Sequence, residues 1–278
     1  MLLKSILFGF GSVLLLTGCF RSVIQSHDIT FDPKHQLQLD VYSQKNKRQA
    51  DVLLFIHGGN WIHGKKSTYA FLGKRLAKKG IVLVVPDYRM GNAINYEMMA
   101  GDVALAIKWT KKNIVNFGGD SSNVFISGHS AGGHLAALVA TDKQYTDQLN
   151  MNNSLKGTIL IDAFGLDIYS YLKNSTYKKD SIYTSTFSRS EKTWKQASPV
   201  NHLHDGMPPF LIFLGTNTFP AVTTDNNIFF KAVKKYQPQT QLILKKHKNH
   251  FEMIFMFLNL NNKSYNQIME FMAKTQAL

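Results

Sequence analysis

The residues best suited to chemistry in this chain form a short segment between glycines, Gly128-His129-Ser130-Ala131-Gly132. Residues 123–127 before it are mostly apolar and rich in β-formers, and residues 134–140 after it are rich in alanine and leucine, which favours a helix. A serine on a tight turn between a strand and a helix projects its hydroxyl from the sheet, where it can act as a nucleophile. The same short pattern also occurs in inert glycine-rich turns, so the flanking elements carry the inference.

The elements around this turn predict a parallel sheet. Continuous apolar runs predict buried strands, and polar–apolar alternation predicts one half-buried strand. The expected strands are 36–42, 52–56, 81–85, 123–127, 158–161, 210–214 and 242–244, and the expected helices are 67–79, 97–112, 134–140, 225–236, 251–259 and 264–276. This alternation predicts an α/β fold, with a mostly parallel central sheet and helices on both faces.

Two glycine-rich segments follow strands of this predicted sheet. Ser130 comes directly after one buried strand, and the loop at Gly58-Gly59 comes directly after another. Functional sites in such sheets lie at the carboxyl ends of the strands. We therefore expect both segments to belong to one site.

Residues 164–208 have weak periodicity and many aromatic side chains. Long irregular segments inside a compact domain usually serve a function. We therefore expect a lid or cap insertion over the edge of the sheet, and a plain surface excursion is the alternative.

The N-terminal residues have the pattern of an export signal. An apolar run from Ser5 to Leu16 follows Lys4 and is too short for a comfortable membrane-spanning helix. The run ends in Leu-Thr-Gly-Cys, which resembles a bacterial lipoprotein signal cleaved before Cys19, the only cysteine of the chain. We expect a signal peptide at 1–18, a lipidated Cys19 with a tether at 19–30, and one domain at 31–278. An ordinary signal peptide, or a buried anchor with an incidental cysteine, is the alternative.

The lipoprotein resemblance implies that acyl chains anchor the protein to a bacterial cell envelope. Phe20 follows the cysteine where an aspartate would retain the protein in the inner membrane, so the resemblance favours the outer membrane where two membranes exist. The formal net charge is +14, but the basic residues are scattered singly and in pairs. We therefore expect no nucleic-acid partner, whereas contact with anionic lipid is compatible with this charge.

The sequence contains no glycine-rich phosphate loop and no metal-ligand spacing. We expect no metal and no cofactor, and we draw no expectation about the oligomeric state.

Several segments together resemble the α/β-hydrolase superfamily, nearest to its small carboxylesterases and kynurenine-formamidase-like esterases. The resemblance spans roughly residues 35–275. Its motifs are His-Gly-Gly-Asn-Trp at 57–61, Pro-Asp-Tyr-Arg at 86–89, Asn-Phe-Gly-Gly-Asp at 116–120, Gly-His-Ser-Ala-Gly-Gly-His at 128–134, Ala-Ser-Pro at 197–199 and His-Phe-Glu at 250–252.

This resemblance implies a serine nucleophile, an acid and a histidine base, in that chain order. Ser130 is then the nucleophile. His250 is the expected base, because it lies in a loop after the last predicted strand and directly before a helix. The other late histidines are His202, His204 and His247, and the first two precede the strand at 210–214.

An ester-cleaving serine also needs hydrogen-bond donors for the oxyanion. We expect these donors to be the backbone N–H groups of Ala131, Gly59 and Asn60. Trp61 is expected to pack the glycine loop and His57 to fix its shape.

The acid is where the chain departs from the related esterases. Thr218 stands about where they carry a carboxylate, and threonine cannot hold a negative charge. Asp162 ends the preceding core strand and is the favoured acid, as if the group had been relocated. Asp225 is a second candidate, although it fits the N-cap of the following helix better. A Ser–His dyad or an inactive protein remains open.

The function expected from these residues and this resemblance is cleavage of small-molecule carboxylic esters through an acyl-enzyme. The aromatic lid is expected to form part of the acyl pocket. Amide cleavage of the arylformamidase type would use the same triad. A degenerate hydrolase fold that serves as a binding module is the third reading, motivated by the missing acid at position 218.

Overall fold

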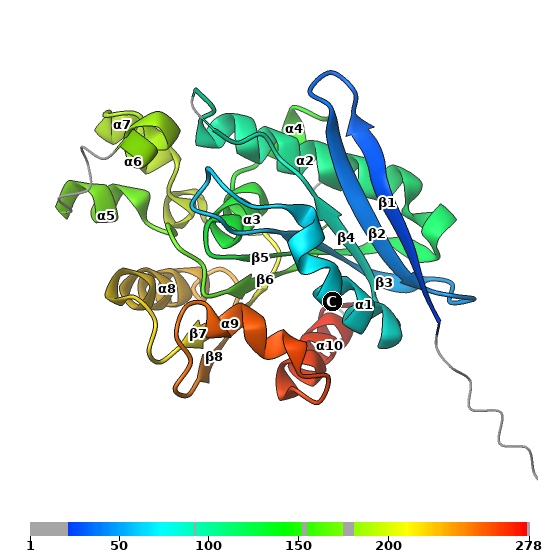
Figure 1. The fold of residues 1–278 in the computed structure, drawn as a ribbon. Helices are drawn as coiled ribbons and strands as arrows, with labels where there is room; N and C mark the ends of the chain where they lie inside the picture. The colour runs from blue at the N-terminus through cyan, green and yellow to red at the C-terminus, as the bar shows by residue number, and fades with distance from the viewer. Residues whose placement is uncertain (1–21, 92, 152–154, 175–180, 277–278) are drawn as a thin grey trace, which may run out of the picture.

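The computed structural model describes residues 22–91, 93–151, 155–174 and 181–276. They form one eight-stranded sheet in the order β1-β2-β4-β3-β5-β6-β7-β8 (Figure 1). The strands are β1 Val23–Asp32, β2 Leu37–Gln44, β3 Ala50–Ile56, β4 Val82–Pro86, β5 Gly119–His129, β6 Leu155–Ile161, β7 Phe210–Gly215 and β8 Gln241–Lys245. The β1–β2 and β2–β4 pairs are antiparallel and the other neighbours are parallel.

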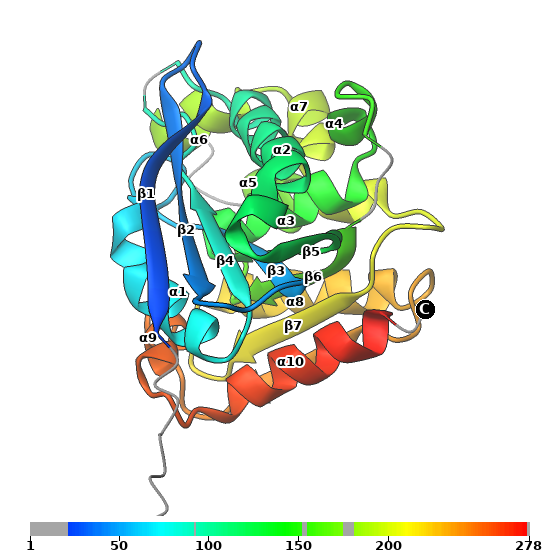
Figure 2. The same cartoon turned by 90° about the vertical axis from the view of Figure 1, so that its right-hand side faces the viewer.

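Helices cover both faces of the sheet. The α-helices are α1 Ala70–Lys78, α2 Tyr96–Asn113, α3 Ala131–Thr141, α4 Gln144–Asp147, α5 Ile168–Asn174, α6 Ser181–Phe187, α7 Glu191–Gln196, α8 Pro220–Val233, α9 Glu252–Phe255 and α10 Lys263–Gln276. The 3-10 turns are η1 Lys66–Tyr69, η2 Ile114–Phe117, η4 Pro199–His202 and η5 Met256–Leu258. Figure 2 shows α2 and α3 on one side of the sheet and α10 on the other.

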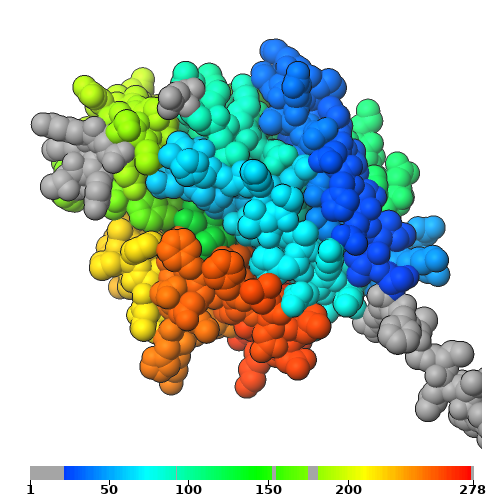
Figure 3. Space-filling view, viewed as in Figure 1, coloured from blue at the N-terminus to red at the C-terminus, as the bar shows by residue number. Residues whose placement is uncertain are grey.

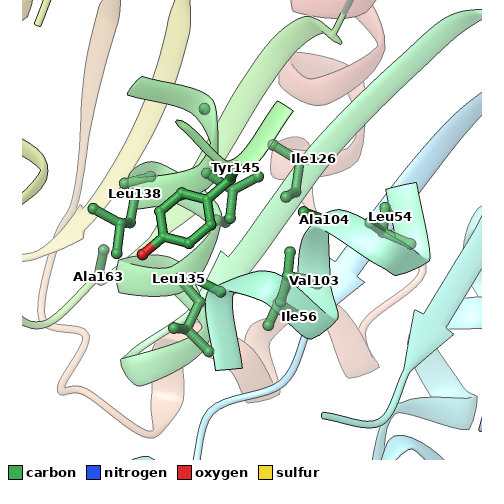
Figure 4. Close-up of a cluster of buried hydrophobic side chains, with 14 of the residues drawn as sticks. Leu54, Ile56, Val103, Ala104, Ile126, Leu135, Leu138, Tyr145 and Ala163 are labelled. Carbon is green, nitrogen blue, oxygen red and sulfur yellow. The ribbon is translucent and has the colours of Figure 1, made fainter. Parts of the chain in front are cut away.

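The core has two layers because successive strand residues point to opposite faces. Leu54 and Ile56 of β3 pack in one cluster with side chains of α2 and α3 (Figure 4). Leu53 and Phe55 of the same strand pack in the other, with α1, α9 and α10. The continuous apolar run of β3 is thus buried on both sides, as predicted for a central parallel strand.

The predicted tether at residues 19–30 is wrong for its described part. Strand β1 begins at Val23 and pairs with β2, so this segment belongs to the sheet. The pairing of β1 with β2 has a register irregularity between Ser26 and Ile29, where Asp28 has a φ of 55°. Such a bulge interrupts the two-residue alternation that identifies a strand in a sequence. Residues 1–18 and Cys19 lie outside the described residues.

Helix α8 begins five residues earlier than predicted. Pro220 occupies the first turn, where the fixed φ of proline suits a helix start. Asp225 therefore lies inside the helix and is buried, and the prediction that it is an N-cap is wrong.

The described part of the segment predicted as a lid forms α5, α6, α7 and η4. Figure 1 shows the three α-helices gathered at one end of the molecule. Phe187 and Trp194 from this segment are buried in the same core cluster as α3. Within the described ranges, every helix is too short or too polar to cross a membrane.

Candidate active site

The turn between β5 and α3 has the geometry of a nucleophile elbow. Ser130 has φ 56° and ψ −126°, a combination that L-residues rarely adopt. Its N–H donates to the Ile161 carbonyl at 3.3 Å, which ties the elbow to the neighbouring strand β6. A Cβ on Gly132 would lie 2.2 Å from the Ile56 carbonyl oxygen, so only glycine permits this packing. The strained turn leaves the Ser130 side chain at the carboxyl edge of the sheet.

Ser130, His250 and Asp162 form one continuous hydrogen-bonded chain. His250 lies in the loop between β8 and α9, and Asp162 directly follows β6. With the imidazole proton on Nδ1, His250 donates to Asp162 Oδ2 at 2.7 Å, and its Nε2 accepts the Ser130 hydroxyl at 2.8 Å. The structure thus brings together the three side chains that the sequence analysis selected.

The Asp162 carboxylate is fully buried and has partners on both oxygens. The Gly215 N–H donates to Oδ1 at 2.9 Å. The Thr218 hydroxyl donates to Oδ2, the same oxygen that binds His250. A buried charge requires such donors because it has lost its water. Thr218, interpreted in the sequence only as the place of a missing acid, is therefore a hydrogen-bond donor to Asp162.

Asp225, the second candidate acid, has neighbours other than His250. Its carboxylate faces the backbone N–H groups of Gly165 and Asp167. Burial, with the Asp167 charge as a smaller cause, raises the Asp225 pKa to about 7. The hydrogen bonds of His250 are to Ser130 and Asp162, so the geometry favours Asp162 as the acid.

The loop after β3 borders Ser130 and contains three successive residues with positive φ. These are Gly59 at 136°, Asn60 at 55° and Trp61 at 62°. The His63 N–H closes the turn on the Gly59 carbonyl at 2.9 Å, and a Cβ on Gly59 would lie 1.9 Å from the His63 carbonyl oxygen. Gly59, Asn60 and Ala131 all line the cavity that contains Ser130. Their assignment as oxyanion donors stays a prediction.

Two aromatic residues hold this loop. Trp61 is fully buried and its indole N–H donates to His134 Nδ1 at 3.2 Å. His57 is stacked on Tyr88, whose hydroxyl donates to the His57 carbonyl at 3.0 Å. Both side chains therefore pack the loop, as expected, although Trp61 also lines the cavity.

His129 contacts His250 in a way that the sequence did not reveal. Its Nε2 lies 3.0 Å from the His250 carbonyl oxygen, and the two rings are 4.8 Å apart. Burial, and then the nearby His250, lower the His129 pKa to about 4. A neutral His129 with its proton on Nε2 donates to that carbonyl and fixes the loop that carries His250. In the sequence, the one feature that could have indicated this contact is the position of His129 directly before Ser130.

The cavity at Ser130 has a volume of about 850 Å³ and a mostly aromatic wall. Phe164, Tyr171, Ile182 and Tyr183 come from the segment predicted as a lid. Another part of the wall is formed by Phe71 of α1 and by side chains from the loops and helices after β7 and β8, namely Phe219, Phe251, Ile254 and Phe255. The cavity therefore suits an apolar group placed next to Ser130.

Outside this cavity, two aspartates and one histidine lie close enough together to have the spacing of a metal site. The donor atoms of Asp32, His35 and Asp102 lie within 4.8 Å of one another. However, the Arg89 guanidinium binds Asp102 at 2.7 Å, and His35 Nδ1 lies 2.6 Å from Asp32. These donors are already engaged with one another and with arginine, so the group functions as an ion-pair network.

The family model BD-FAE matches residues 39–232. The chain belongs to the BD-FAE family. The match includes Ser130 and Asp162 and ends before His250, so the place of the histidine in this BD-FAE member comes from the structure.

This BD-FAE member is similar to several esterases. It is 32% identical over 193 residues to esterase LipC of Mycobacterium tuberculosis, which covers 64% of this chain and 47% of that protein. It is 26% identical over 243 residues to the isoprenylcysteine alpha-carbonyl methylesterase ICME of Arabidopsis thaliana, covering 81% and 56%. The chain thus spans about half the length of the curated relatives it matches.

Solved structures show the same fold as this BD-FAE member. Esterase B from Lactobacillus rhamnosis, in a crystal structure with an inhibitor, superposes with a TM-score of 0.74 at 17% identity, covering 91% of this chain and 88% of that one. Esterase 2 from Thermogutta terrifontis, with propionate bound, gives 0.70 at 20% identity, covering 89% and 94%. The predicted α/β-hydrolase fold is confirmed.

Proposed function

We propose that this chain is a serine hydrolase that cleaves carboxylic esters of small molecules. The single observation that carries the proposal is the hydrogen-bonded chain Asp162–His250–Ser130 at the wall of an apolar cavity. The esterase names of its relatives support the same reaction class.

The geometry supports an acyl-enzyme mechanism. His250 Nε2 takes the Ser130 proton as Oγ attacks the ester carbonyl carbon, and the carbonyl π electrons move to the oxygen. The N–H groups of Gly59, Asn60 and Ala131 are the donors proposed for that oxyanion. The intermediate collapses by breaking the bond to the alcohol oxygen, which receives the proton from His250. Water, deprotonated by His250, then attacks the acyl carbon. The bond from that carbon to Ser130 Oγ breaks, Oγ takes the proton back from His250, and the carboxylic acid leaves.

Asp162 contributes by holding the imidazole in one tautomer and by stabilising the imidazolium ion that forms. Its own position is fixed by Gly215 and Thr218. The binding-module reading was motivated by the missing acid at position 218. The contact between Asp162 and His250 supports the enzyme over that reading, because a carboxylate does face the histidine.

The test is hydrolysis of short-chain p-nitrophenyl esters by the wild-type protein and by Ser130→Ala. We expect the wild type to turn over and the variant to lose at least about 10⁴-fold in kcat. Labelling by a fluorophosphonate probe, which needs an activated serine, is expected for the wild type alone. Folded wild-type protein that neither reacts with the probe nor cleaves any ester would refute the hydrolase.

The export signal supports a second proposal, that Cys19 is lipidated and tethers the enzyme to the cell envelope. It depends on the sequence of residues 1–19 only. Replacing Cys19 by Ser is expected to move the protein from the membrane fraction to the soluble fraction. An unchanged distribution between the two fractions would contradict it.

A further inference from the structure

Exposed apolar side chains gather at the mouth of the cavity. Among the described residues, eleven large apolar side chains are exposed, and five of them lie in two segments, the loop after β7 and residues 251–260 directly after His250. These five, here called the mouth patch, are Phe219, Phe251, Phe255, Leu258 and Leu260. Single exposed apolar residues are ordinary, whereas a cluster around a site marks an interaction surface.

The mouth patch is held rigidly outward. Phe257, between its members in sequence, is fully buried, and its carbonyl accepts the Tyr265 hydroxyl at 2.6 Å. The Leu258 carbonyl accepts the Arg75 Nε–H at 2.9 Å. Phe251 and Phe255 are nevertheless 62% and 53% exposed. The fold therefore anchors the segment through its neighbours while presenting these side chains to solvent.

The patch is continuous with the cavity. Phe219, Phe251 and Phe255 are exposed and also line the cavity that contains Ser130. Figure 3 shows the orange surface of this segment beside the cyan surface of α1 and the loop before it. An apolar molecule lying on the patch would reach Ser130 along aromatic side chains, without crossing open water.

Exposed lysines flank the segment that carries the patch, on both sides along the chain. Lys246 and Lys248 precede Phe251, Lys263 follows Leu260, and Arg75 binds the backbone between them. Glu252 is the single acidic residue of the segment 246–263, and its carboxylate accepts the Asn249 N–H at 2.9 Å. Apolar side chains with a basic rim match the headgroups and acyl chains of an anionic lipid surface.

The start of β1, where the described chain begins, lies on the same side of the molecule as α9, which carries part of the mouth patch. Figure 1 draws the start of β1 and α9 in the lower half, and Figure 2 draws both at the lower left. The sequence before β1 includes the apolar run from Ser5 to Leu16. A chain held at a membrane by these residues has the mouth patch within reach of that membrane.

We propose that the mouth patch seats on an anionic lipid surface and that the cavity takes lipophilic esters from that surface. The second half of this statement rests on the proposed hydrolase function, and the first half does not. The partner is the lipid phase itself, recognised by burial of the patch and by the lysines of its rim.

The seating is tested by tryptophan quenching in the full-length protein. Leu260→Trp places a reporter in the patch, and Val115→Trp places one at an exposed apolar position in η2, directly after α2. Both proteins are bound to vesicles of phosphatidylglycerol and phosphatidylcholine with brominated acyl chains. We expect extra quenching for Leu260→Trp alone, because an anchor elsewhere in the chain leaves both reporters in water. Equal quenching of the two variants would overturn the proposal.

Delivery of substrate is tested by activity. Leu258→Ser/Leu260→Ser removes two patch side chains that do not line the cavity, and Met98→Ser/Val115→Ser removes two exposed apolar side chains elsewhere. We expect the first pair to lose about tenfold on a long-chain p-nitrophenyl ester carried in the vesicles and nothing on soluble p-nitrophenyl acetate. The second pair should change neither rate.

The outcomes separate the two proposals. A patch variant that keeps its rate on the vesicle-borne ester overturns the delivery of substrate. A wild type that cleaves neither ester refutes the hydrolase, and quenching at position 260 still decides whether the patch seats on lipid.

Discussion

The side chains of Thr218 and Asp162 are hydrogen-bonded to each other, directly beside the ring of His250. The Thr218 hydroxyl donates to Asp162 Oδ2, and His250 Nδ1 binds the same oxygen at 2.7 Å. Thr218, the position at which the resemblance to related esterases led us to expect an acid, therefore faces the carboxylate that binds His250. Two loops, one after β6 and one after β7, share one carboxylate.

Removing the Thr218 hydroxyl should slow the reaction without abolishing it. Thr218→Val has the same shape but leaves Asp162 Oδ2 with one donor fewer, so the carboxylate is held less firmly against His250. We expect kcat to fall about tenfold, the cost of one hydrogen bond to a charged group. Thr218→Ser keeps the hydroxyl and should stay within about threefold of the wild type on the same p-nitrophenyl ester. A loss in Thr218→Ser with none in Thr218→Val would show that the methyl group, and not the hydroxyl, matters.

The acid should be transferable between the two loops. Asp162→Asn is expected to lower kcat by about 10⁴-fold, because the histidine loses its charged partner. In Asp162→Ser/Thr218→Asp the new carboxylate lies beside the place that Oδ2 has left, and kcat should recover at least about tenfold over Asp162→Ser alone. No recovery in a correctly folded double variant would mean that the position after β7 cannot reach His250.

Asp225 should matter for stability rather than for catalysis. Burial raises its pKa to about 7, so the folded state holds a proton there that the unfolded state releases near pH 4. This group therefore destabilises the fold progressively as the pH rises from about 4 to 7. Asp225→Asn should remove that loss, raising the free energy of unfolding at pH 8 by at most ~4 kcal/mol and leaving it unchanged near pH 3.

The measurement is urea unfolding of both proteins at several pH values, with ester hydrolysis at pH 8 as the control. Hydrolysis by Asp225→Asn should stay close to the wild-type rate, because the hydrogen bonds of the His250 ring are to Asp162 and Ser130 and not to Asp225. A large loss of kcat in the folded variant would give Asp225 a role in catalysis.

The loop at Gly59 should tolerate no side chain. Gly59→Ala would place a Cβ 1.9 Å from the His63 carbonyl at a φ of 136°, so the donors beside Ser130 must shift. We expect kcat to fall by about 10²-fold or more, as for the loss of an oxyanion donor. Gly101→Ala in α2 is the matched control, since its Cβ meets nothing within 4 Å. That variant should keep its activity and gain roughly 0.5–1 kcal/mol of stability. Equal activity of the two variants would exclude this loop from catalysis.

The sequence by itself determined the framework of the site. The apolar runs of β3, β4, β6 and β7 predicted a parallel sheet, because residues buried on both faces leave no polar alternation. The glycines around Ser130 predicted the elbow, since close packing there excludes a Cβ. The strands and the glycine turn depend on residues that are neighbours in the chain, so a short stretch of sequence is enough to predict them.

Only the tertiary structure decided which groups meet across the sheet. Asp162 and His250 are 88 positions apart, and the choice between Asp162 and Asp225 depended on which carboxylate the folded loops bring to the imidazole. The same applies to Thr218 as a donor, to β1 as an edge strand interrupted by a bulge, and to the grouping of the mouth patch. Each depends on distances between segments that the fold brings together, and no local pattern encodes such a distance.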